Sequence, residues 1–169
     1  PATAANVAPQ AAPVPTGPVR VLVVDDSPSI HMLMKQIFTP QEGFEIVGKA
    51  MNGLEAAEFL KKNKIDVMTL DIHMPEQDGV EYLRTNFGPN HPPVIMVSSV
   101  SREDSSLATQ ALEIGASDYV EKPALNNIKQ RADELRTKAR CAVNSSQAPK
   151  NLALDHSFKV TNKIEQPES

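Results

Sequence analysis

Short apolar runs alternate with longer amphipathic segments through the middle of this chain. The runs are rich in valine and isoleucine, as in strands that are covered on both faces of a sheet. We predict strands at 19–24, 44–50, 67–70, 94–97 and 118–121. The run at 44–50 is more polar than the run at 19–24, which favours a position at the edge of the sheet.

Between these runs, apolar residues recur at intervals of three and four, which is the spacing of one helix face. Ser27 and Pro28 predict the start of the first helix, as N-cap and first helical residue. The second helix is predicted to start at Asn52-Gly53. Its inward residues are predicted to be Leu54, Ala57 and Leu60. Further helices are predicted around 80–87, 107–112 and 125–142.

The order of these elements is strand, helix, strand, helix, repeated five times. Such alternation predicts an α/β fold, a (βα)5 doubly wound parallel sheet with right-handed crossovers and helices on both faces. In sheets of this kind a ligand lies beyond the carboxyl ends of the strands, at a topological switch point. The residues that follow the strands are therefore the first candidates for function.

The two ends of the chain differ from its middle. Residues 1–18 contain five prolines, many alanines and no charged side chain, and residues 144–169 are polar without sustained periodicity. Such segments offer little apolar surface to bury. We predict a disordered linker at 1–18, a domain at 19–143 and a polar linker or tail at 144–169. The chain begins without methionine, and we expect it to be an excised piece of a longer protein.

The composition argues against nucleic-acid-binding, membrane-spanning and disulfide-bonded proteins. The chain has 169 residues, 40% hydrophobic and 22% charged, which suits one soluble domain with tails. A net charge of −4 disfavours direct nucleic-acid binding, and no apolar run approaches the roughly 20 residues that span a membrane. The single cysteine, Cys141, excludes an intrachain disulfide and indicates a reducing, cytoplasmic location.

Carboxylates follow two of the predicted buried strands. Asp25 and Asp26 end the first run, and Asp71 ends the run at 67–70. Each has an ordinary structural interpretation as well, because acidic residues also favour the start of a helix. Three carboxylates brought together repel one another, and a hard cation such as Mg²⁺ relieves that repulsion. Their joint placement predicts a Mg²⁺ site.

A hydroxyl and an ammonium follow the other two strands at the same edge. Ser98 ends the run at 94–97, and Lys122 follows the run at 118–121. Either residue alone has an ordinary interpretation, as a loop cap or a solvated lysine. Together with the carboxylates they form a set that suits a phosphoryl group.

At this point the chain resembles the receiver domain of two-component response regulators. The residues that carry the resemblance are Val-Val-Asp25-Asp26-Ser, Leu70-Asp71-Ile-His-Met-Pro-Glu-Gln-Asp78-Gly79, Ser98-Ser99 and Gly115-Ala-Ser-Asp-Tyr-Val-Glu-Lys-Pro123. The spacings of 45, 27 and 24 residues between Asp26, Asp71, Ser98 and Lys122 also fit. The resemblance implies a flavodoxin-like sheet with strand order 2-1-3-4-5.

The resemblance assigns the phosphoryl chemistry to a few residues. Asp71 is implied to accept a phosphoryl group from a phosphohistidine of a sensor histidine kinase. Lys122 is implied to neutralise the phosphoryl oxygens, and Ser98 to donate a hydroxyl hydrogen bond to them. Tyr119 is implied to swing inward behind Ser98, so that these two residues form the switch. The fourth helix, fifth strand and fifth helix then become the readout face.

The resemblance also implies the metal ligands. Asp26 binds Mg²⁺ directly, Asp25 mainly through water, and Asp71 and the backbone carbonyl of His73 complete the protein's share. The bond between Lys122 and Pro123 is implied to be cis, a form mainly available before proline.

Within the family, two segments most resemble the regulatory domain of chemotaxis protein-glutamate methylesterases. They are Val94-Ile-Met-Val-Ser-Ser99 and Leu112-Glu-Ile-Gly-Ala-Ser-Asp-Tyr-Val-Glu-Lys-Pro123. The catalytic domain of those proteins is not expected here, because the serine of Gly115-Ala116-Ser117-Asp118 lacks the glycines that follow the esterase serine. The sequence leaves three outputs open: an attached output domain, a separate target protein, or phosphorylation-dependent homodimerisation through the last helix.

Other functions fit the residues less well. A Mg²⁺-dependent phosphatase with an aspartyl-phosphate intermediate needs a second aspartate two residues after the first, where this chain has His73. A scaffold that never carries phosphate leaves the complete acceptor set without a purpose, and a stand-alone single-domain regulator stays open. Val100 offers no polar group to the attacking water. We therefore expect a long-lived aspartyl phosphate, although a role of His73 in orienting water stays open.

Overall fold

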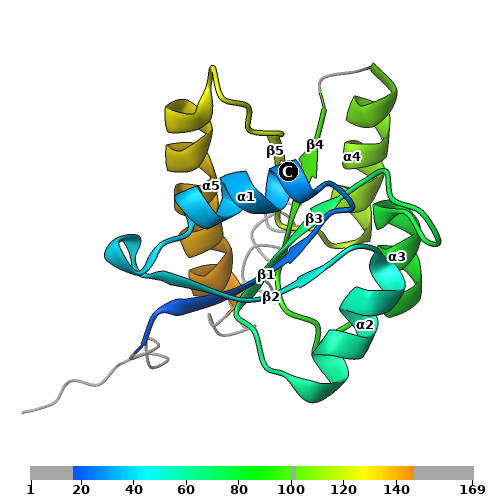
Figure 1. The fold of residues 1–169 in the computed structure, drawn as a ribbon. Coiled ribbons are helices and arrows are strands. Elements are labelled where there is room, and N and C mark those ends of the chain that lie inside the picture. The colour runs from blue at the N-terminus through cyan, green and yellow to red at the C-terminus, as the bar shows by residue number, and fades with distance from the viewer. Residues whose placement is uncertain (1–16, 100–101, 147–169) are drawn as a thin grey trace, which may run out of the picture. The chain divides into compact units, whose positions relative to one another are not determined.

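Five parallel strands form the centre of the domain, in the order β2-β1-β3-β4-β5 (Figure 1). The computed structural model describes residues 17–99 and 102–146. The strands are β1 (Val19–Val24), β2 (Phe44–Ala50), β3 (Val67–Asp71), β4 (Val94–Ser98) and β5 (Asp118–Glu121). This order and the edge position of β2 confirm the predicted fold class.

The five helices cover both faces of the sheet. They are α1 (Pro28–Ile37), α2 (Gly53–Lys62), α3 (Gly79–Asn86), α4 (Arg102–Ile114) and α5 (Ile128–Ser146), with a short 3-10 turn, η2 (Pro40–Glu42). Figure 1 shows α1 and α5 together on one side of the sheet and α2, α3 and α4 on the other. Successive helices therefore change from one face of the sheet to the other between α1 and α2 and again between α4 and α5, which is the doubly wound arrangement.

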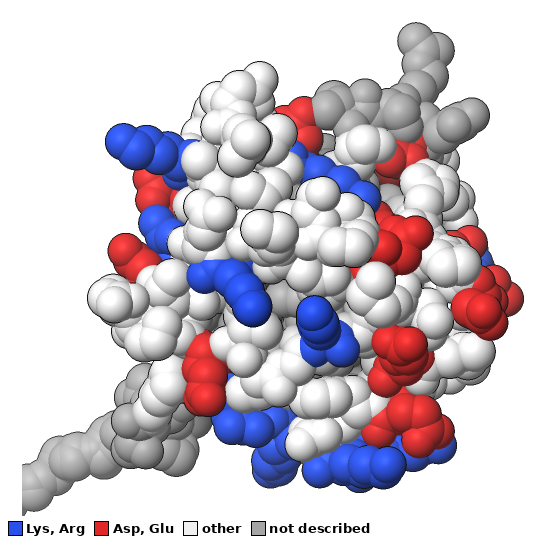
Figure 2. All heavy atoms as spheres, viewed as in Figure 1, with Lys and Arg blue, Asp and Glu red and all other residues white. Residues whose placement is uncertain are grey.

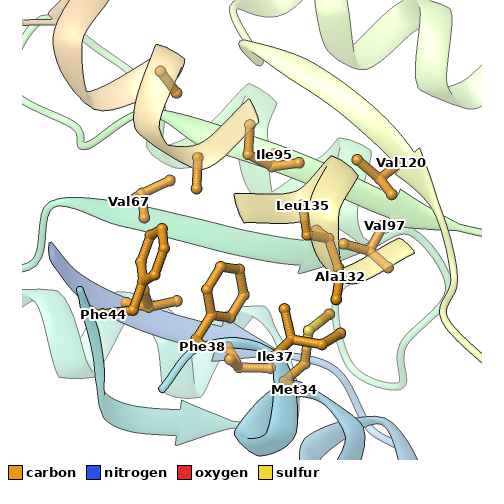
Figure 3. Close-up of a cluster of buried hydrophobic side chains, with 14 of the residues drawn as sticks. Met34, Ile37, Phe38, Phe44, Val67, Ile95, Val97, Val120, Ala132 and Leu135 are labelled. Carbon is orange, nitrogen blue, oxygen red and sulfur yellow. The ribbon is translucent and has the colours of Figure 1, made fainter. Parts of the chain in front are cut away.

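Each face of the sheet has its own hydrophobic core. Figure 3 shows the core beneath α1 and α5, where Phe38 and Phe44 meet edge to face with ring centroids 5.0 Å apart. The second core joins β1, β3 and β4 to α2, α3 and α4, and includes the fully buried Leu70 and Leu83. Because strand residues alternate between the two cores, the central strands β3 and β4 are apolar apart from Thr69 and the residues at their carboxyl ends.

Side chains cap two of the helices at their amino ends. The Asn52 side chain accepts a hydrogen bond from the Glu55 N–H, and the Asp78 side chain accepts one from the Glu81 N–H. Ser27 holds the N-cap position of α1 as predicted, but its hydroxyl makes no capping bond. Its N–H donates instead to Asp25 Oδ1 at 2.8 Å, so this turn holds an acidic side chain in place.

The prediction that Leu54 of α2 faces inward was wrong. Leu54 is 53% exposed, whereas Ala56 is completely buried. Gly53 and Ala56 are the buried residues of α2, with Leu60 partly buried against the second core. A Cβ at Gly53 would meet Gln77 and Tyr82, so the start of α2 packs closely against the α3 side, while the neighbouring Leu54 is exposed.

The predicted linkers at 1–18 and 144–169 fall almost wholly outside the described residues. Helix α5 runs to Ser146, three residues beyond the predicted end of the domain at 143. None of the helices in the described part is both long and apolar enough to cross a bilayer. On the face drawn in Figure 2, acidic and basic side chains are interspersed, with no continuous basic surface.

Candidate functional site

The carboxyl ends of β1, β3 and β4 bring the predicted acidic and hydroxyl residues to one edge of the sheet. Val24 pairs with Leu70, and Asp71 pairs with Val97, so the residues that follow these positions are neighbours. Asp25, Asp26 and Asp71 each offer a carboxylate oxygen, and these oxygens lie within 4.8 Å of one another. The structure therefore brings together the three carboxylates that the sequence singled out.

Lys122 lies against the same carboxylates. Its Nζ is 3.2 Å from Asp71 Oδ1 and 3.6 Å from Asp25 Oδ2. Its backbone N–H donates to the carbonyl of Ser98 at 2.8 Å, which fixes the base of the side chain beside the end of β4. The ammonium thus offsets part of the negative charge of the cluster.

Burial dominates the electrostatics of this cluster. Asp25 and Asp71 are each 2% exposed, whereas Asp26 is exposed. Burial raises the pKa of the Asp71 carboxyl from its ordinary value of 3.8 to about 6, with the charge of Asp25 adding to the rise and Lys122 opposing it. Burial also raises the pKa of Asp25, against the hydrogen bond from the Ser27 N–H. Burial lowers the pKa of Lys122, but the charges of Asp71 and Asp25 outweigh it and the net direction is upward.

Two buried carboxylate oxygens have no hydrogen-bond partner. In the described part of the chain they are Asp25 Oδ2, which the Lys122 ammonium approaches to 3.6 Å, and Asp71 Oδ2. Buried polar atoms normally have hydrogen-bond partners, so these two carboxylate oxygens fit a role as ligands of a cation or of its bound waters. Oxygen-only ligands at this spacing fit Mg²⁺, which binds few carboxylates and keeps several waters.

A glycine fixes the loop that follows Asp71. The Gly79 N–H donates to the carbonyl of Ile72 at 2.8 Å, which folds the loop back onto the end of β3. A Cβ at position 79 would meet the backbone oxygen of Asp71 at 2.3 Å. Only glycine allows this approach, so Gly79 helps to set the position of the acceptor backbone.

The two predicted switch residues occupy different environments. Ser98 is 2% exposed at the end of β4, and Tyr119 is 41% exposed on β5. The Tyr119 ring points outward, where the Lys138 Nζ lies 6.0 Å from its centroid. Within the described residues, no hydrogen bond joins the Ser98 hydroxyl to Asp71.

The predicted cis bond between Lys122 and Pro123 was wrong for this structure. No peptide bond among the described residues is cis, and this pair lies within them. The preference for trans before proline is only about 0.5–1 kcal/mol, so the surrounding fold decides the isomer and the dipeptide alone does not.

The structure adds residues that sequence reasoning missed. His31 is buried on α1, and its Nε2 lies 2.7 Å from the backbone oxygen of Asp25. Asp104, on α4, is 2% exposed and lies 2.6 Å from His73 Nε2. Nothing in the local sequence pattern singled out His31 or Asp104.

A second hollow lies near the opposite edge of the sheet. It has a volume of about 680 Å³ and is lined by residues of α2 and α3 and by the segments that lead into the amino ends of β3 and β4. The Tyr82 hydroxyl lies 2.8 Å from His91 Nε2, and His91 Nδ1 lies 2.7 Å from the carbonyl of Pro92. Its deepest polar groups are thus paired with one another, and the acidic edge remains the candidate site.

Comparisons with known proteins agree with this geometry. The model of the response regulator receiver domain matches residues 21–133. A protein-glutamate methylesterase/protein-glutamine glutaminase of Archaeoglobus fulgidus is 44% identical over 130 residues, which are 76% of this chain and 37% of that protein. The chain thus spans little more than a third of the length of that relative.

Two solved structures are similar in fold and in sequence. The response regulator domain of Thermotoga maritima CheB has a TM-score of 0.68 and 41% identity, covering 75% of this chain and 97% of that one. The CheX-CheY-BeF3-Mg²⁺ complex of Borrelia burgdorferi has a TM-score of 0.57 and 36% identity, covering 70% and 90%. These findings confirm the predicted resemblance, and the chain belongs to the response regulator receiver domain family.

Proposed function

We propose that this chain is a phosphorylation-controlled switch in which Asp71 is the acceptor and a sensor histidine kinase is the donor. The observation that carries the proposal is the buried cluster itself. A carboxylate with an unpaired oxygen lies 3.2 Å from an ammonium, beside two further carboxylates, at the carboxyl edge of a parallel sheet. Membership of the receiver family supports the same assignment.

The transfer step exchanges one bond to phosphorus for another. An Asp71 carboxylate oxygen attacks phosphorus, the phosphorus–nitrogen bond of the phosphohistidine breaks, and the histidine nitrogen keeps the electron pair. A pKa of about 6 leaves Asp71 mostly ionised near pH 7.5, which the nucleophile requires. Such transfer depends on positioning and charge neutralisation more than on covalent chemistry from the protein.

Other residues around Asp71 neutralise the phosphoryl oxygens and bind the metal ion. Lys122 neutralises phosphoryl oxygens on one side, from the position where it now contacts Asp71. Asp26, Asp71 and the backbone carbonyl of His73 would hold Mg²⁺, with Asp25 binding it mainly through water, and the ion would supply charge neutralisation and orientation. The unpaired oxygens of Asp25 and Asp71 support this ligand set.

Phosphorylation changes the conformation through Ser98 and Tyr119. A phosphoryl group adds about −1.5 to −2 charges and three strong acceptors, which attract the Ser98 hydroxyl and the Lys122 ammonium. Ser98 moves toward Asp71, and Tyr119 turns inward behind it. The face formed by α4, β5 and α5 then reports the state to an output domain or a partner protein.

The output we propose is of the chemotaxis type, in the cytoplasm. The relative from Archaeoglobus fulgidus is named as a methylesterase and glutaminase, and it is much longer than this chain. We infer that the switch controls such an activity in a longer parent protein, while the domain described has no catalytic role of its own.

Binding of beryllofluoride, a stable mimic of the phosphoryl group, tests the proposal. The chain should bind beryllofluoride only with Mg²⁺ present, and isothermal calorimetry should show one site per chain. Asp71→Asn should abolish binding, whereas the matched control Asp133→Asn, at an exposed carboxylate on α5, should retain it. Absence of binding by the native chain would contradict the proposal and favour a scaffold that carries no phosphate.

A further inference from the structure

A buried aspartate on α4 ties together two loops of the acidic edge. Asp104 Oδ1 lies 2.6 Å from His73 Nε2, in the loop after β3. Asp104 Oδ2 accepts a hydrogen bond from the Ser99 N–H at 3.2 Å and another from the Ser99 hydroxyl, in the loop after β4. We call these three residues, His73, Asp104 and Ser99, the loop clamp.

The clamp is a built feature of the site rather than a surface contact. Asp104 is 2% exposed, so its carboxylate depends on these neighbours in place of water. Hydrogen bonds to a buried charged group are worth more than ordinary ones, and an unsatisfied buried carboxylate is costly. Both loops are therefore held to the same helix.

Two residues of the loop clamp are close in sequence to Asp71 and Ser98, the residues that the proposed switch brings together. His73 is two residues after Asp71, and Ser99 directly follows Ser98. The proposed switch requires Ser98 to move toward a phosphoryl group on Asp71. Ser99 donates with both its backbone and its side chain to α4, which restrains that movement.

We propose that Asp104 is a positioning residue that holds the loop carrying Ser98 in its unphosphorylated arrangement and thereby weakens phosphoryl-group binding at Asp71. This inference rests on the function proposed above. The differential contact is specific: the clamp stabilises one position of Ser98, and a phosphoryl group stabilises the other. Release of the clamp shifts the population toward the phosphoryl-bound arrangement before any ligand arrives.

The effect should be visible in the affinity for beryllofluoride at saturating Mg²⁺. Ser99→Ala removes one donor without changing any charge, and we expect affinity to rise about two- to fivefold, within the range of an ordinary hydrogen bond, because the Ser99 N–H still donates to Asp104. Asp104→Asn should raise affinity about three- to tenfold. The matched control is Glu113→Gln, which removes an exposed negative charge from the same helix and should leave affinity unchanged.

Two comparisons separate the clamp from a simple charge effect. His73→Ala, which removes one partner of the Asp104 carboxylate, should raise affinity. The double variant His73→Ala with Asp104→Asn should bind no more tightly than Asp104→Asn alone, because both changes open the same clamp. A rise in Asp104→Asn that disappears at high salt, with no rise in Ser99→Ala, would overturn the proposal in favour of plain electrostatics.

The experiment distinguishes a failure of the inference from a failure of the proposed function. Mg²⁺-dependent binding of beryllofluoride by the native chain, and its loss in Asp71→Asn, tests the proposed function. The ratio of the beryllofluoride affinity of each clamp variant to that of the native chain tests the inference. Because Ser99 is exposed and Ser99→Ala leaves Asp104 in place, that variant should fold even if Asp104→Asn does not. Unchanged or weakened beryllofluoride binding by Ser99→Ala and His73→Ala, in a native background that binds, would overturn the clamp.

Discussion

Neutralising Asp71 should stabilise the fold in the absence of metal, and the gain should depend on pH. Asp71 is the most perturbed carboxyl of the acidic edge, with a pKa raised to about 6 by burial and by the neighbouring charge of Asp25. Because the folded state holds this proton more tightly than the unfolded chain does, folding is favoured at low pH and loses stability as pH rises from about 4 to about 6. Asp71→Asn removes that loss.

The magnitude follows from the pKa difference. A rise from 3.8 to about 6 is about two pKa units, which corresponds to about 3 kcal/mol of unfolding free energy above pH 7. The group is almost completely buried, so solvent screens little of this effect. In EDTA we expect Asp71→Asn to gain about 2–3 kcal/mol at pH 8 and less than about 1 kcal/mol at pH 4.

Urea denaturation followed by circular dichroism measures both values. Asp133→Asn serves as the control, because its side chain is 81% exposed and should change stability by less than about 0.5 kcal/mol at either pH. Mg²⁺ should stabilise the native chain more than Asp71→Asn, since it binds the folded carboxylate cluster. An equal gain at both pH values, or no gain at pH 8, would refute the reasoning from burial.

Three further predictions follow from the same geometry. Leu83→Ala, in the second core, should cost about 2–5 kcal/mol in urea denaturation, whereas Leu54→Ala, at an exposed position, should cost less than about 0.5 kcal/mol; similar costs would contradict the assignment of the α2 face. Lys122→Met removes the ammonium beside Asp71, so the Asp71 pKa in NMR titration should rise further and beryllofluoride affinity should fall more than about tenfold; retained affinity would argue against its role. The phosphorylated chain should keep its phosphoryl group for minutes or longer in Mg²⁺, as followed by phosphate release, and loss within seconds would show that His73 or another group activates water.

The fold could be predicted from the sequence because each level of the pattern agreed with the next. Apolar runs at 67–70 and 94–97 became the central strands, and the more polar run at 44–50 became an edge. The convergence of the carboxylates followed from the same topology, since the carboxyl ends of parallel strands share one edge. The proximity of Lys122 to Asp71 followed from β5 lying beside β4.

The departures have local physical causes that a linear pattern does not contain. Leu54 has the right residue type for a core, but the small residues Gly53 and Ala56 are buried in its place. The Ser27 hydroxyl is a common cap, yet here the backbone N–H of that residue serves Asp25. Asp104 contacts His73 and Ser99, which belong to loops distant from each other in sequence, and contacts of that kind have no periodic signature.

Site-mapped phosphorylation tests the central claim most directly. The chain is incubated with acetyl phosphate, a small-molecule phosphodonor, with and without Mg²⁺, and the modified residue is located by mass spectrometry of peptides. We predict one phosphoryl group per chain, on Asp71, formed only with Mg²⁺ and absent in Asp71→Asn. Failure to incorporate phosphate, or a phosphoryl group on another residue, would contradict the account.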